Sequence, residues 1–111
     1  MSPCAPLAWS LRFYDPAVAF RVLAFHYPRS EHRQEMVERI TRAAAVMARC
    51  PGFVAADCWF EADGDAVVAV GTFQSEEDWR RAMHAVAGAD IDFDFDERER
   101  QPRRVQLLVE A

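Results

Sequence analysis

The stretch FVAADCWFEADGDAVVAVGTF, residues 53–73, decides the fold of this chain. Its two ends, residues 53–61 and 66–73, are rich in β-branched and aromatic side chains, which favour strands. Residues 62–65 (ADGD) contain the Asp-Gly pair that is typical of a tight hairpin turn. The stretch therefore predicts two antiparallel strands joined by a short turn.

A helix is predicted on each side of this hairpin. Apolar residues at three- and four-residue spacing predict an amphipathic helix from Ser30, as its N-cap, to about Arg49, and Pro51-Gly52 ends it. The sequence Ser75-Glu76-Glu77-Asp78 forms an S-x-x-D capping box that opens the second helix. The buried stripes are Met36, Ile40, Ala43, Ala44, Met47 and Cys50 in the first helix, and Trp79, Ala82, Met83 and Val86 in the second.

Two outer strands complete the pattern. Residues 20–27 (FRVLAFHY) form the first, and residues 105–109 the last, after a charged connection over 90–99 and a break at Pro102. The order βαββαβ, with right-handed crossovers, predicts a ferredoxin-like α+β fold with an antiparallel four-stranded sheet. We expect one domain over residues 20–111, preceded by an N-terminal extension over residues 1–19.

The first strand is apolar on both of its faces. Phe20, Val22 and Ala24 alternate with Leu23, Phe25 and Tyr27. Two helices cover only one face of a four-stranded sheet, so an uncovered face would expose large apolar side chains. The sequence therefore predicts a homodimer that packs two sheets face to face as a dimeric α+β barrel, with the N-terminal extension as the rival cover.

Composition excludes several classes of partner. The 111-residue chain carries a net charge of −5, which argues against nucleic acid and against an anionic membrane surface as partners. All 13 basic residues are Arg, and Lys and Asn do not occur, which indicates a bacterial genome of high GC content. Three unclustered cysteines and an N-terminus interrupted by Pro3 and Pro6 indicate reduced thiols and a cytoplasmic protein without a signal peptide.

The sequence predicts no metal and no cofactor. Its three histidines are isolated and lack metal-ligand spacing. Asp92, Asp94 and Asp96 resemble the start of a calcium loop, but Glu97 stands where the loop needs Gly, so a solvated acidic segment is the preferred interpretation. Nucleophile motifs and Gly-rich phosphate loops do not occur either.

Two segments resemble the antibiotic-biosynthesis-monooxygenase-like family of dimeric α+β barrels. They are PGFV at 51–54 and GTFQSEEDW at 71–79, and the resemblance spans residues 20–111. It implies a relation to cofactor-free quinone-forming monooxygenases, heme-degrading enzymes or small isomerases. Several oxygenases of this family use an Asn on the first strand, and this chain has no Asn. The family's frequent Trp at the end of the third strand is Phe73 here, and the Trp79–His84 spacing is shorter than that of the heme-degrading relatives.

Six residues are candidates for a site. His26, His84 and Asp57 are the candidate catalytic groups, as bases or as a carboxylate beside an indole. Trp59, Phe73 and Trp79 are the candidate ligand-binding residues. Each of the three catalytic candidates also has a structural interpretation: His26 as a hydrogen-bonded core histidine, His84 as an exposed helix residue, and Asp57 as an ion-paired residue of an edge strand. Cys58, on the other face of its strand from Asp57, is expected to pack in the core.

Two functions remain open from the sequence. The first is a cofactor-independent monooxygenase that acts on a small aromatic or polyketide-type substrate. The second is a non-catalytic protein of the same fold that binds a small aromatic ligand or serves assembly. The missing Asn favours the second function, and the fold alone does not choose between them.

Overall fold

The computed structural model describes residues 19–111, so residues 1–18 of the predicted extension lie outside the described part. The elements follow the predicted order βαββαβ. They are β1 (Phe20–Pro28), a 3-10 turn η1 (Ser30–His32), α2 (Arg33–Met47), β2 (Phe53–Phe60), β3 (Val67–Phe73), α3 (Glu76–Gly88) and β4 (Glu99–Val109). The predicted ferredoxin-like fold class is confirmed.

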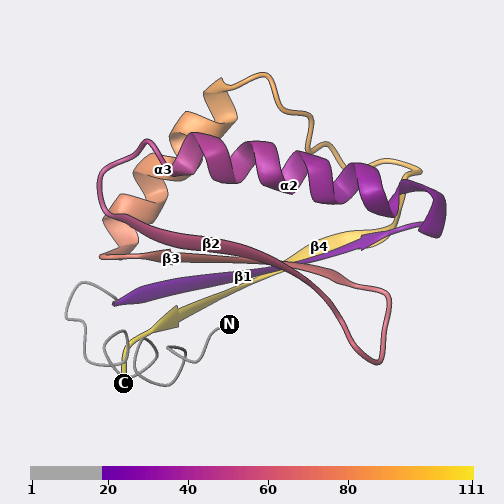
Figure 1. Ribbon diagram of the computed structural model, residues 1–111, viewed down its shortest axis with the longest axis horizontal. Helices are drawn as coiled ribbons and strands as arrows, with labels where there is room; N and C mark the ends of the chain where they lie inside the picture. Colours follow the sequence, from indigo (N-terminus) through magenta and orange to yellow (C-terminus); the bar gives the residue numbers. More distant parts are fainter. Residues whose placement is uncertain (1–18) are drawn as a thin grey trace, which may run out of the picture.

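The four strands form one antiparallel sheet in the order β2-β3-β1-β4 (Figure 1). The predicted hairpin puts β2 beside β3, and β1 lies between β3 and β4. In the β1–β3 pair, Val22 is opposite Gly71 and Ala24 is opposite Ala69. The chain thus places its two most apolar strands in the centre of the sheet, where a strand has neighbours on both edges.

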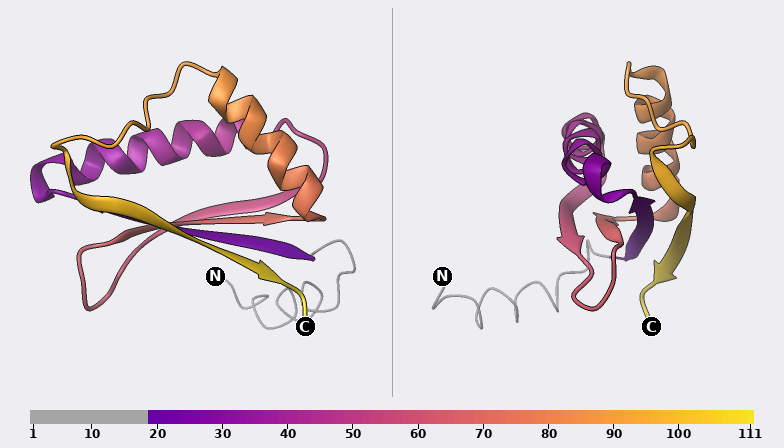
Figure 2. Two further views of the ribbon diagram at one scale, coloured as in Figure 1. Left: turned by 180° about the vertical axis from the view of Figure 1, so that it is seen from behind. Right: turned by 90° about the vertical axis from the view of Figure 1, so that its right-hand side faces the viewer.

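Both helices cover the same face of the sheet (Figures 1 and 2). Met36 and Ile40 of α2 pack with Val67 of β3 in a buried cluster, as the predicted apolar stripe requires. Within residues 19–111 no helix is long and apolar enough to cross a membrane. The opposite face, which we call the open face, carries Leu23 and Phe25 of β1, and no helix of the described chain packs on it.

A β-bulge in β2 changes which residues share a face. Phe53 is opposite Phe73, but the next pair is Ala55 with Thr72, so one extra residue is inserted between them. The shift moves Phe53 to the helix-covered face, and Asp57 alternates onto the open face. The candidate carboxylate Asp57 therefore lies on the opposite face of the sheet from Phe53.

Two predicted element boundaries are also corrected. Ser30 is not the N-cap of a helix: it starts η1, and His32 precedes α2 without a side-chain capping bond. The last strand begins at Glu99 rather than Val105 and contains Pro102. Pro102 is tolerated because β4 is an edge strand. One side of such a strand has no neighbouring strand, so a residue without an N–H group on that side costs no hydrogen bond between strands.

Gly52, in the turn between α2 and β2, lies against Asp78 at the start of α3. Its φ of +84° is a left-handed conformation that favours glycine, and a Cβ atom there would lie 2.1 Å from the Asp78 carboxyl carbon. Asp78 is fixed in place, because its N–H donates to Ser75 Oγ at 3.1 Å and its carboxylate pairs with Arg81 at 2.6 Å. Ser75 is thus confirmed as the N-cap of α3, although Asp78 accepts from the Ser75 hydroxyl and not from its N–H group, and Asp78 packs directly against the Pro-Gly turn.

We expect Gly52→Ala to lower the free energy of unfolding by about 2–3 kcal/mol, because it combines backbone strain with a clash against a buried carboxylate. Gly88→Ala is the matched control: a Cβ at Gly88 meets nothing within 4 Å. Chemical denaturation of both variants measures the difference. Equal stabilities would show that the Gly52–Asp78 contact does not constrain the fold.

Candidate active site

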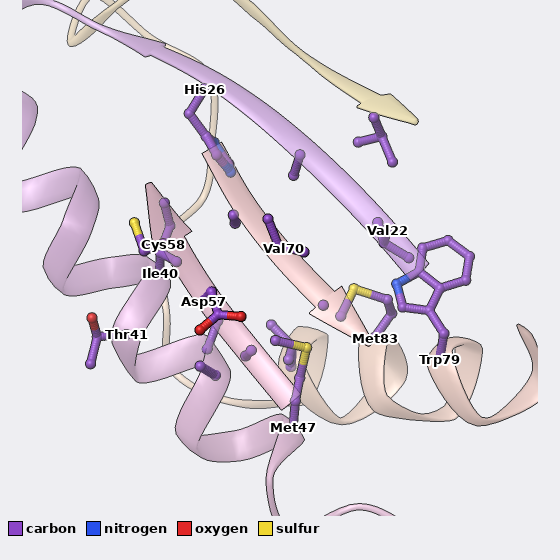
Figure 3. Close-up of a pocket in the computed structure, with 18 of the residues that line it drawn as sticks. Val22, His26, Ile40, Thr41, Met47, Asp57, Cys58, Val70, Trp79 and Met83 are labelled. Atoms are coloured by element: carbon purple, nitrogen blue, oxygen red, sulfur yellow. The ribbon is translucent and has the colours of Figure 1, made fainter. Parts of the chain in front are cut away.

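A cavity of about 350 Å³ lies between the two helices and the covered face of the sheet (Figure 3). Its volume is within the range of small-ligand sites, roughly 300–1,000 Å³. The wall is mainly aliphatic and aromatic. It includes Ile40, Ala43, Ala44 and Met47 of α2, Trp79, Met83 and Val86 of α3, and Val22, Ala24, Ala69 and Phe73 of the sheet. Such a wall suits a small, largely apolar ligand.

His26 lies at one end of this cavity, near the end of β1. The residue is 4% exposed, and its Nδ1 atom is buried without a hydrogen-bond partner among the described residues. Burial, and after it the nearby charges of Arg103 and Arg39, together lower the pKa of His26 to about 4. His26 is therefore uncharged at neutral pH.

Phe93 brings the two guanidinium groups together beside His26. Its ring centroid lies 6.1 Å from that of His26, and the guanidinium carbons of Arg103 and Arg39 lie 5.6 Å and 5.9 Å from it. Arg103 also donates to the Phe93 carbonyl oxygen, and Arg39 donates to that of Asp92 at 2.8 Å. Of these residues, His26, Arg103 and Phe93 line the cavity, so this end is cationic and the rest is apolar.

The opposite end of the cavity is aromatic. Trp79 stacks at a tilt on Phe20, with ring centroids 5.6 Å apart, and the edge of Phe73 meets Phe53 at 5.8 Å. Phe73 is fully buried, whereas Trp79 is half-buried at the wall. Both residues were predicted to bind a ligand, and the structure brings them into the same cavity as His26.

The other three predicted site residues lie at its margin or outside it. Asp57 is exposed and borders the cavity from the edge strand β2. Trp59 is 63% exposed and shares the open face with Asp57, because the two alternate with Cys58. His84 is exposed on α3 and is outside the lining, since Trp79, Met83 and Val86 turn a different side of the helix to the cavity.

Sequence analysis missed Arg103, Arg39 and Phe93. Arg103 was assigned to a connection, because the last strand was expected to start at Val105. The alternation of Arg103 with Val105 is the signal that places both on one face of β4. Cys58 was expected in the core; it is exposed and borders the cavity instead, because β2 is an edge strand.

By sequence, the chain matches no protein-family model and no curated protein at a significant level. Solved structures do match. A conserved protein from Methanosarcina mazei superimposes with a TM-score of 0.75 at 12% identity, over 89% of this chain and 99% of that one. The monooxygenase from the gene ActVA-Orf6 of Streptomyces coelicolor, solved with the ligand Nanaomycin D, superimposes with a TM-score of 0.65 at 19% identity, over 87% and 91%. This is the fold of the antibiotic-biosynthesis monooxygenases.

A third structure extends the comparison. SnoaB, a cofactor-independent oxygenase from Streptomyces nogalater, superimposes with a TM-score of 0.59 at 24% identity, over 85% of this chain and 93% of that one. The family resemblance seen in the sequence is therefore confirmed at the level of the fold. A putative antibiotic biosynthesis monooxygenase from Nitrosomonas europaea agrees, with a TM-score of 0.68. At these identities the likeness concerns the fold and not the activity.

The low pKa of His26 predicts a pH-dependent stability. In the unfolded chain His26 has its ordinary pKa of 6.5 and is protonated below that pH. In the folded chain His26 stays uncharged down to about pH 4. Between pH 7 and pH 5 this linkage should lower the free energy of unfolding by about 2 kcal/mol. Urea unfolding at the two pH values measures the loss, and His26→Gln should lack that part of it. His84→Gln, at an exposed histidine, should keep it; an identical loss in His26→Gln would contradict the assignment.

Proposed function

We propose that this chain is a cofactor-independent monooxygenase that oxidises a small aromatic or polyketide-type substrate. The observation that carries the proposal is a largely apolar cavity with one buried, uncharged histidine at its end. Two proteins of the same fold, ActVA-Orf6 and SnoaB, are described as a monooxygenase and a cofactor-independent oxygenase. Their class is compatible with such a cavity.

In the proposed reaction the substrate supplies its own electrons. An electron-rich phenol of the hydroxyanthrone type loses a proton and reacts with O₂. Its CH₂ group becomes a carbonyl, which keeps one oxygen atom, and the other oxygen atom leaves as water. The protein then has three tasks: to exclude water, to hold a flat molecule between Trp79 and His26, and to accept one proton. We assign the role of proton acceptor to His26, whose Nδ1 has no hydrogen-bond partner among the described residues.

Ligand binding without catalysis is the alternative function. It is favoured by the absence of Asn, which several oxygenases of the resembling family use. The same cavity holds an aromatic ligand whether or not the ligand reacts, because apolar burial and stacking do not require a reaction. Oxygen uptake separates the two functions.

We expect oxygen consumption with hydroxyanthrone-type phenols in the presence of a chelator and without added cofactor. His26→Gln should lower kcat about 100-fold, because an amide does not accept the proton. Arg42→Gln, at an exposed position of α2, is the control and should retain the wild-type rate. Asp57→Asn and His84→Gln test the other two candidate bases, and smaller losses are expected from their positions. A panel of phenols without uptake above the buffer rate would favour the ligand-binding alternative.

We also propose that the chain forms a homodimer through the open face. Leu23 and Phe25 lie there opposite Val70 and Val68 of β3, and Leu108 of β4 adds an exposed apolar side chain. Packing two such faces removes this surface from water, at about 1.5–3 kcal/mol for each large side chain that becomes fully buried.

Sedimentation equilibrium at micromolar concentration should report about twice the chain mass of 12.7 kDa. Val68→Asp should shift the protein to the monomer, because it places a charge in the centre of the open face. Ala45→Asp, at an exposed position of α2, should remain dimeric. A folded wild-type monomer at this concentration would refute the barrel.

A further inference from the structure

Four buried polar atoms near the cationic end of the cavity have no hydrogen-bond partner among residues 19–111. They are His26 Nδ1, Arg39 Nε, Arg39 Nη2 and Glu99 Oε1. His26 and Glu99 are each 4% exposed and Arg39 is 2% exposed, so bulk water does not reach these side chains freely. Buried polar groups in folded proteins are almost always paired, so the four atoms indicate a further partner at this place.

The three side chains converge from three elements: β1, α2 and the first residue of β4. Phe93 links the first two, because its ring centroid lies 6.1 Å from that of His26 and 5.9 Å from the Arg39 guanidinium carbon. Glu99 is opposite Pro28, which shares a face of β1 with His26. The charge of Arg39 acts on both His26 and Glu99. Within the described chain, however, Glu99 Oε1 forms no bond to the guanidinium.

The four atoms match the hydrogen-bonding capacity of one water molecule. The two Arg39 nitrogens only donate, and an ionised Glu99 carboxylate only accepts. Nδ1 of uncharged His26 accepts when the ring proton is on Nε2. A water molecule can accept two hydrogen bonds and donate two, and buried waters in proteins typically make about three.

Charged occupants fit these atoms less well than water does. An anion would be attracted to Arg39, but it would face the lone pairs of His26 Nδ1 and Glu99 Oε1. A cation would be attracted to Glu99, but it would face the guanidinium of Arg39. A small neutral molecule that both donates and accepts satisfies all three side chains, and water is the smallest such molecule.

The surroundings also reverse the usual order in which His26 and Glu99 hold a proton. Burial is the main cause that lowers the pKa of His26 from 6.5 to about 4. Burial is also the main cause that raises the pKa of Glu99 above its ordinary value of 4.5. A proton that reaches His26 is therefore held more tightly by Glu99. The charged groups that act on Glu99 are Arg103 of β4, Arg39 of α2, and Asp96 and Arg98 of the connection before β4.

We propose that one buried water molecule links His26, Arg39 and Glu99, and that Glu99 receives through this water the proton that His26 accepts from the substrate. Glu99 is then a positioning residue for the proton, because it acts through His26 and does not touch the substrate. The inference deepens the proposed oxygenase function, and it rests on that function for the source of the proton.

The proton transfer balances in two stages. When the substrate loses a proton to His26 Nδ1, the electron pair of the broken bond stays on the substrate. His26 Nδ1–H then donates to the water, which passes one of its own protons to Glu99 Oε1, so that His26 and the water are restored. Glu99 returns the proton when the second oxygen atom of O₂ leaves as water. That water contains the two hydrogen atoms that the substrate CH₂ group loses as it becomes a carbonyl.

The water site is tested without substrate. A high-resolution crystal structure of the full chain should show one water molecule within about 3.2 Å of His26 Nδ1, an Arg39 nitrogen and Glu99 Oε1. A Glu99 carboxylate in direct contact with the Arg39 guanidinium, with no water between His26 and Glu99, would refute both the water site and the relay.

The relay is tested by steady-state oxygen uptake with a hydroxyanthrone. Glu99→Gln keeps the shape of the side chain, and it should lower kcat about 10-fold with KM within about twofold of the wild-type value. Glu99→Asp retains a carboxylate and should recover part of the lost rate. A raised KM with an unchanged kcat would mean that Glu99 only shapes the site, and it would refute the relay.

Glu97→Gln is the matched control. Glu97 is exposed and lies two residues before Glu99, and its replacement changes the net charge equally. This variant should retain the wild-type kcat and KM. An equal loss of kcat in Glu97→Gln and Glu99→Gln would mean that only the overall charge matters, which would contradict the assignment of Glu99.

The relay and the oxygenase fail in different ways. Oxygen uptake by the wild-type chain with an unchanged kcat in Glu99→Gln refutes the relay and leaves the oxygenase intact. No uptake by the wild-type chain refutes the oxygenase and, with it, the relay. The crystal structure then decides on the water site by itself, because that measurement needs no turnover.

Discussion

The contact between Gly52 and the Asp78 carboxylate fixes the geometry of the cavity. Gly52 ends the turn after α2, and Asp78 is in the first turn of α3, so this contact sets the distance between the two helices at one end. Asp78 is buried there, and a buried carboxylate is tolerated only because Ser75 and Arg81 satisfy it. Trp79 is the next residue, so the same contact orients the indole that forms the aromatic end of the cavity. Fold and site therefore share one constraint.

The cavity has two ends of different chemistry, and β1 connects them. Phe20 at its start packs under Trp79, and His26 near its end lies beside Phe93 and Arg103. Six residues of extended strand separate these positions by about 20 Å. The separation is enough for a planar molecule of several fused rings. The polarity of the cavity therefore distinguishes its two ends, one aromatic and one cationic.

Much of the fold could be predicted because local signals agreed with the tertiary arrangement. The Asp-Gly turn, the Ser75–Asp78 capping box and the Pro51-Gly52 stop all correspond to features of the structure. The bulge at residues 53–55 could not be predicted, because a slip of one residue depends on the pairing with β3 and leaves no mark in hydrophobic alternation. The same slip reassigns the faces of β2. It explains why Trp59 lies on the open face and why Asp57 only borders the cavity.

The site was only partly visible in the sequence for a related reason. His26, Phe73 and Trp79 lie on elements whose periodicity was clear, and all three line the cavity. Arg103 lies next to Pro102 on an edge strand. Because proline is rare within strands, the residues around Pro102 were not predicted to form one. Its pairing with β1 is also irregular, with register shifts around Tyr27.

The alternation of side chains along β4 has a functional side. Successive residues of a strand point to opposite faces of the sheet. On β4, Arg103 faces the cavity and Arg104 faces the open side, where it covers Phe25. The cationic end of the cavity and the proposed dimer face therefore meet at two adjacent residues of one strand. Because the two side chains act on different faces, charge can be removed from either surface without removing it from the other.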